Sequence, residues 1–132
     1  MHRPQLSSGI ATGIGGLPHR DAVDAATFVL RNMELPAIPT LPRRSPAEGS
    51  MAQAMVGMQG ITVGQYGSIA VDATLVDPLA PIVTDLDHDA FLGFRTFLEL
   101  AHEQQFVGPV KWQFVGPVSF GLALMRAGVP MS

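Results

Sequence analysis

A helical pattern that lies between two short apolar runs constrains the fold of this chain most strongly. Residues 10–15 form the first apolar run, and Asp21 follows it closely as a candidate N-cap. Apolar side chains then recur at i, i+3, i+4 and i+7 spacing, which predicts an amphipathic helix from Asp21 to about Glu34. Short apolar strands that alternate with such helices are typical of α/β units, so we predict an α/β fold.

Two further helices are predicted in the second half of the chain. One begins at Asp85 or Asp87, and its expected buried face comprises Phe91, Phe94, Leu98 and Ala101. A strand is then expected over residues 110–115, and Gly116 and Pro117 open a helix that runs to Ala127. Because this last helix has almost no polar face, we expect it to be buried on several sides.

The segments between these elements carry weaker patterns. Residues 35–42 contain three prolines without an N–H donor, so this segment is predicted to be extended but not a central strand. A helix is expected from Ala47 to about Met58. Residues 61–63 and 68–72 have strand composition, and residues 64–67 could turn between them to give a hairpin.

Composition excludes several classes of protein. The chain has 132 residues, of which 47% are hydrophobic and 14% are charged, so we predict a single folded domain over residues 1–132 rather than a disordered chain. A net charge of -3 disfavours nucleic acid as a partner. The lack of cysteine excludes disulfides and thiolate metal sites. No leader or membrane span stands out, so a cytoplasmic protein is expected, with much of its apolar surface covered by a partner or by a larger body.

Two segments carry a resemblance to a known family. The first is the turn Thr12-Gly13-Ile14-Gly15-Gly16-Leu17-Pro18 with the helix and the proline-rich run that follow it. The second is residues 110–119, Val-Lys-Trp-Gln-Phe-Val-Gly-Pro-Val-Ser, followed by the apolar helix. Together they resemble the amino-terminal part of the superfamily of cobalamin-independent methionine synthase and uroporphyrinogen decarboxylase. The likeness is to the short, single-barrel, methionine-synthase-like proteins.

The resemblance implies a TIM barrel, of which this chain would supply only the first β/α units. A whole barrel typically needs about 250 residues, so the domain is expected to be incomplete. In the family, the turn after the first strand holds the amino-acid substrate, which implies substrate contacts at Ile14, Gly15 and Gly16. The family has serine where this chain has Gly16. A later Gly-Pro turn maps onto Gly116 and Pro117, with Ser119 close to a hydroxyl position of the family.

Zinc is implied for the full-length family only. Its ligands, a histidine, two cysteines and a glutamate, lie in the later half of the barrel and have no counterparts in this chain. The four histidines share no ligand spacing, so neither a metal site nor a cofactor is expected within these residues. The repeated acids Asp85, Asp87 and Asp89 lack the glycine and glutamate of a calcium loop, and we expect them to stabilise the start of a helix.

Three polar residues complete the candidate substrate site. His19 and Arg20 lie just beyond the first turn, where barrel enzymes place working loops, and both could bind a substrate carboxylate. A solvated loop beside a helix cap is the alternative, and it is slightly favoured for both residues. Trp112 and Gln113 alternate on the expected strand, so one faces the barrel interior and the other faces the helices. An inward Gln113 would offer a ligand contact, although simple burial with a satisfied amide is the alternative.

Two hypotheses for function remain open. In the first, the chain is the amino-terminal part of a methionine-synthase-like methyltransferase that acts on a small amino acid or thiol. Its full-length relatives transfer a methyl group from a folate to homocysteine, and we do not expect this chain alone to be catalytic. In the second, the chain is a non-catalytic partial barrel, a binding or structural module stabilised by self-association. The expected partners are therefore the missing carboxy-terminal half or a second copy of the chain.

Overall fold

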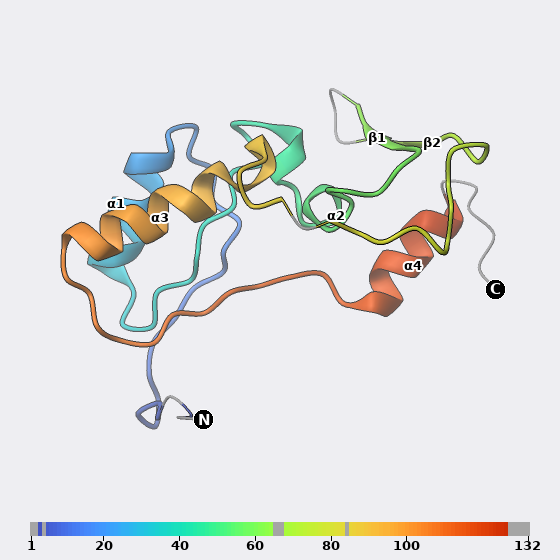
Figure 1. The fold of residues 1–132 in the computed structure, drawn as a ribbon. Coiled ribbons are helices and arrows are strands. Elements are labelled where there is room, and N and C mark those ends of the chain that lie inside the picture. Colours follow the sequence, from blue (N-terminus) through green and yellow to red (C-terminus); the bar gives the residue numbers. More distant parts are fainter. Residues whose placement is uncertain (1–2, 4, 65–67, 84, 127–132) are drawn as a thin grey trace.

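The computed structural model describes residues 3, 5–64, 68–83 and 85–126, and it shows a mixed α/β fold (Figure 1). Its longer helices are α1 (Ala22–Asn32), α3 (Leu92–Glu103) and α4 (Pro117–Arg126). A short helix, α2, spans Ser50–Ala54, and single 3-10 turns cover Pro46–Glu48 and Asp89–Phe91. The strands β1 (Ile61–Val63) and β2 (Ile69–Val71) form an antiparallel pair in which Thr62 faces Ala70.

Three extended segments run parallel to one another between the helices. Isolated parallel bridges join Thr12 to Leu35, Gly16 to Thr40, and Ala37 to Lys111. The segment over residues 35–40 is therefore the middle one, between residues 11–17 and the segment around Lys111. The strands expected over residues 10–15 and 110–115 are not formed: both stretches are extended, but their pairing is limited to single bridges.

The proline-rich segment is extended and lies between the other two, but it forms only isolated bridges and no strand of a sheet, as predicted. Its paired donors are all non-proline residues: Leu35 N–H donates to Ala11 (3.0 Å), Thr40 N–H to Gly15 (2.8 Å), and Ile38 N–H to Lys111 (2.9 Å). Pro36 takes part through its carbonyl, which accepts from Lys111 N–H at 2.8 Å. The prolines therefore restrict the pairing to isolated bridges without preventing it.

The core lies where α1 and α3 pack on each other and on the extended segments, as Figure 1 shows for the two helices. Asp21 caps α1 by accepting from Asp24 N–H at 2.9 Å, which confirms the predicted start of this helix. Phe97 of α3 is fully buried, together with small residues of α1 and the apolar residues of the middle segment, namely Ala25, Ala26, Val29, Ile38 and Leu41.

The buried face of α3 agrees with the prediction at Ala101 but not at Leu98. Gly93, Phe97 and Ala101 are buried, whereas Leu98 is 44% exposed. The 3-10 turn before the helix advances by about three residues per turn, so the phase set at Phe91 does not continue into α3. Gly93 is required because an added Cβ would lie 2.9 Å from the Pro39 carbonyl oxygen, where the middle segment crosses the helix.

Two other helix predictions need correction. The helix expected from Ala47 to Met58 is a 3-10 turn followed by the short α2, with Gly49 between them. Helix α4 has the expected start, but among its described residues only Gly121 and Leu124 are buried, so it is not covered on several sides. The predicted hairpin is confirmed in β1 and β2, and residues 65–67 of its turn lie outside the described part.

Candidate functional site

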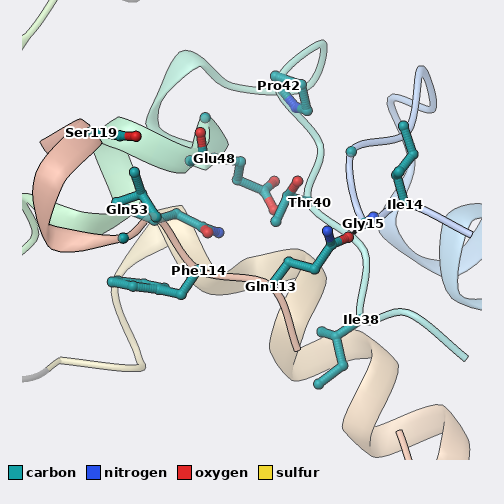
Figure 2. A pocket seen from close by; sticks show the side chains of 15 residues that line it. Ile14, Gly15, Ile38, Thr40, Pro42, Glu48, Gln53, Gln113, Phe114 and Ser119 are labelled. Carbon is teal, nitrogen blue, oxygen red and sulfur yellow. Dashed lines mark hydrogen bonds between the residues drawn. The ribbon is translucent and has the colours of Figure 1, made fainter. Parts of the chain in front are cut away.

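A cavity of about 500 Å³ opens at the carboxyl ends of the three extended segments (Figure 2). Each segment contributes residues at or just beyond its bridge to a neighbour. The first supplies residues 14–16, the middle one Ile38, Thr40 and Pro42, and the third residues 113–116. Glu48, residues 49–50, Gln53 and Ser119 close the other side. Crevices at the carboxyl ends of parallel strands are the usual place for ligand sites in α/β proteins.

A hydrogen bond across this cavity joins the first and third segments. Gly15 N–H donates to Gln113 Oε1 at 2.6 Å, and Figure 2 shows the Gln113 side chain extending toward Gly15. Gly15 also accepts from Thr40 N–H, and an added Cβ would lie 2.8 Å from the Ile38 carbonyl oxygen. Glycine is therefore needed here for the close approach of the first and middle segments.

Side chains of the third segment alternate as expected. Trp112 contacts the Phe94 ring of α3 with 5.1 Å between ring centroids, so it lies on the side of the helices. Gln113 and Lys111 both extend to the first segment, where Lys111 Nζ donates to the Gly13 carbonyl at 2.5 Å. These two side chains hold the first segment to the third across the middle one.

The structure brings most of the predicted site residues together. Five of them line the cavity, together with Ser119: Ile14, Gly15, Gly16, Gln113 and Gly116. These residues come from two turns that are far apart in the sequence. Ile14 is 70% exposed and forms part of the cavity mouth. An added Cβ at Gly16 would come no closer than 3.9 Å to Thr40 Oγ1, so the cavity has room at the position of the family's serine.

Three predicted residues lie outside the cavity lining. His19 is half-buried and packs on Phe28 of α1 with 5.3 Å between ring centroids, and its Nδ1 atom has no hydrogen-bond partner among the described residues. Arg20 is exposed next to the start of α1. Pro117 is the first residue of α4, one position beyond the lining residue Gly116. His19 and Arg20 follow the first turn, and Pro117 follows the second. In both places the lining residues come before them in the chain.

The buried carboxylate of Glu48 was not predicted from the sequence. This residue is fully buried and forms a salt bridge with Arg44, and its Oε1 atom accepts from Gly93 N–H at 3.2 Å. Arg44 also binds Asp89 Oδ1 at 3.1 Å and the Asp89 carbonyl at 2.7 Å. The i,i+4 spacing of Arg44 and Glu48, with Ser45 as the N-cap between them, was the available signal.

The surroundings of these carboxyl groups shift their pKa values in opposite directions. Burial raises the pKa of Glu48 above its ordinary value, although hydrogen bonding and charge attraction from Arg44 act against this effect. The hydrogen bond from Arg44 holds the pKa of Asp89 below its ordinary value. Glu48 is the only ionisable group among the described residues that line the cavity.

Glu48 is expected to make stability depend on pH. Its raised pKa means that the folded protein binds this proton more tightly than the unfolded chain does. The stabilisation is fully present below the unfolded pKa of about 4.3 and is lost as the pH rises through the folded value. We therefore expect the free energy of unfolding of the wild type to rise relative to that of Glu48→Gln as the pH falls from neutrality toward the unfolded pKa of about 4.3.

Urea unfolding of both proteins across this pH range measures the effect. Asp89 contributes in the opposite direction, because a lowered pKa gives stability that is lost only as the pH falls below about 3.9. Measurements above about pH 5 therefore isolate Glu48. A difference between the two proteins that stays constant or shrinks on acidification would contradict the expected effect.

The described residues do not provide the zinc site that the family resemblance implies for whole barrels. No three histidine, aspartate or glutamate side chains gather as metal ligands in the described part of the chain, and the sequence has no cysteine. The donor set therefore does not fit that ion. Within the described ranges, no helix is long and apolar enough to cross a membrane.

Comparisons with known proteins do not assign a family. No family model, no curated protein and no solved structure matches this chain.

Proposed function

We propose that this chain forms the first β/α units of a methionine-synthase-like barrel, and that its main cavity binds a small amino acid or thiol. One observation carries the proposal. The two turns on which the resemblance rests are 98 residues apart at Gly15 and Gln113, and a hydrogen bond of 2.6 Å joins them at the cavity. The resemblance concerned sequence alone, so this meeting in space is independent support for it.

The order of the extended segments also supports a barrel. Each segment is parallel to the next one along the chain. Helix α1 lies between the first two, and α2, the β1–β2 hairpin and α3 lie between the second and third. Parallel neighbours in sequential order, connected by helices, are the arrangement of a TIM barrel. The cavity then corresponds to the mouth of the barrel, where the βα loops of such proteins bind substrates.

The groups around the cavity suit a small zwitterion. Thr40, Gln113 and Ser119 offer neutral hydrogen-bonding groups. The N-terminus of α4 adjoins the cavity through Gly116 and Ser119, and helix N-termini attract carboxylates. Glu48 lines the cavity as well, but its carboxylate is already paired with Arg44 and is therefore not counted as a partner for the ammonium group. A strongly anionic ligand is disfavoured because no cationic side chain is among the described lining residues.

The proposal concerns binding and does not assign methyl transfer to this chain alone. Methyl transfer in the family is zinc-dependent, and the donors described above do not fit that ion. The residues of this chain would hold and orient the amino-acid end of the substrate. Gln113 would maintain the first turn in its binding position by accepting from Gly15 N–H.

Calorimetric titration with homocysteine tests the proposal, with and without added zinc. We expect saturable binding that does not require zinc. Gln113→Ala should weaken it, because Gly15 N–H loses its acceptor, whereas Gly16→Ser should strengthen it by about two- to tenfold by adding one hydrogen bond. Gln104→Ala, at an exposed position after α3, is the matched control. Absence of binding to the folded wild type in both conditions would exclude this function.

A second function, a self-associating structural module, is favoured by the surface of α4. Val118, Leu122 and Met125 are 75%, 49% and 52% exposed, which is unusual for an apolar helix. In this alternative we expect concentration-dependent dimers in sedimentation velocity, and Leu122→Glu should abolish them. Dimers without homocysteine binding would favour the structural module, and a compact monomer at all concentrations would exclude it.

A further inference from the structure

A row of aromatic rings extends from the core to the surface on the side of the third segment that faces the helices. Neighbouring ring centroids are 6.4 Å apart for Phe91 and Phe94, 5.1 Å for Phe94 and Trp112, and 5.7 Å for Trp112 and Phe114. Phe91 is buried, whereas Trp112 and Phe114 are 49% and 53% exposed. The planes of the last two rings meet at 65°, so they form an open corner.

This corner forms part of a second cavity, of about 270 Å³. Phe91, Trp112 and Phe114 supply aromatic walls, and aliphatic side chains such as Leu86 complete the lining. This cavity shares Phe114 and Gln53 with the main one, and Phe114 therefore lies between the two. The volume lies just below the range of about 300–1,000 Å³ that is common for drug-sized ligands, so the cavity suits a small molecule.

The charge at this second cavity is negative. Asp85 is the only ionisable residue among the described residues that line it. A second acid, Asp87, lies two positions further along the chain, and its backbone N–H donates to Asp85 Oδ1 at 3.0 Å. The nearby cation, Arg95, donates to the carbonyls of Leu86 and His88 at 2.6 and 2.7 Å and is not part of the lining.

We propose that this second cavity binds a small organic cation, such as a quaternary or alkylated ammonium group. The faces of Trp112 and Phe114 attract a cation through their ring quadrupoles, and Asp85 adds an opposite charge. A neutral apolar molecule of the same shape would gain the apolar contacts but neither of these attractions. The proposal does not rest on the function proposed for the main cavity, because it uses another ligand and another charged group.

Fluorescence of the native chain provides a direct test. Trp112 is the only tryptophan in the sequence, and it lines this cavity but not the main one, so its emission reports on ligands bound here. The probes are choline and its uncharged carbon isostere, 3,3-dimethyl-1-butanol, with sodium chloride at equal concentration as the ionic-strength control. We expect choline to change the emission saturably and the isostere to bind at least about fivefold more weakly. Equal responses to the two probes, or no saturable response to choline, would overturn the proposal.

Two variants separate the contribution of the Asp85 charge to choline binding from that of the Phe114 ring. Asp85→Asn removes the charge at an exposed position and should weaken choline binding by about two- to fivefold at low salt. Phe114→Leu removes one aromatic wall and should weaken it by about tenfold. Asp24→Asn, at an exposed position on α1, controls for the change in net charge. Unchanged choline affinity in Asp85→Asn would contradict the assignment even if Phe114→Leu failed to fold.

Discussion

Replacing Arg44 with alanine is expected to lower the free energy of unfolding at neutral pH by about 3–5 kcal/mol, because it removes the partner of a buried charge. Glu48 is fully buried, and without Arg44 its carboxylate would have no cationic partner and would keep only backbone N–H contacts, from Gly93 and Leu41. The same substitution also removes the hydrogen bonds from Arg44 to Asp89, which tie the 3-10 turn before α3 to the loop after the middle segment.

Urea unfolding of a matched set of variants tests this expectation. The double variant Arg44→Ala/Glu48→Gln should recover much of the loss, since a neutral amide costs far less to bury than an unpaired carboxylate. Arg43→Ala, at the exposed neighbouring position, should change stability by less than about 0.5 kcal/mol. If the variants at positions 43 and 44 were equally stable, the structural role of the salt bridge would be disproved.

Replacing Phe97 with alanine is expected to lower the free energy of unfolding by about 3–5 kcal/mol. Its ring is fully buried between α1 and the middle segment, so its removal leaves a cavity in the centre of the core. The matched control is Leu98→Ala on the same helix. Leu98 is 44% exposed, and its truncation should cost less than about 1 kcal/mol.

Thermal or urea unfolding of these two variants distinguishes the observed helix phase from the one predicted by the sequence pattern. The pattern placed Leu98 on the buried face, whereas the structure places Phe97 there. A larger loss in Leu98→Ala than in Phe97→Ala would support the sequence pattern against the structure.

The sequence predicted the elements whose signals are local. Asp21 predicted the start of α1, Gly116 and Pro117 predicted the start of α4, and the two short apolar runs predicted the β1–β2 hairpin. In each case a cap, a turn residue or an alternating pattern lies within a few residues of the boundary. These signals depend little on the rest of the fold.

Features that depend on tertiary contacts were not predicted. The middle segment pairs on both sides despite three prolines, because its neighbours meet the N–H groups of Leu35, Ile38 and Thr40. The phase of α3 follows from the 3-10 turn before it and from the close approach of the middle segment at Gly93. No local pattern contains that information.

The candidate site was predicted in part. The turn at residues 14–16 and the polar residue Gln113 were identified, and the structure places them around one cavity. His19 and Arg20 were expected there because they follow the turn, but their side chains lie outside the cavity lining. Glu48 was missed because its burial depends on contacts with Arg44 and Gly93.

The central claim is that the cavity between the first and third turns binds a small amino acid. A titration of the ¹⁵N-labelled protein with homocysteine, followed by amide chemical shifts in two-dimensional NMR, tests it most directly. The account predicts saturable shifts at Gly15, Gly16, Gly116 and the Gln113 side-chain amide, with the Gly9 amide unaffected. Saturable shifts confined to other parts of the chain, or none at homocysteine concentrations well above the millimolar range, would contradict it.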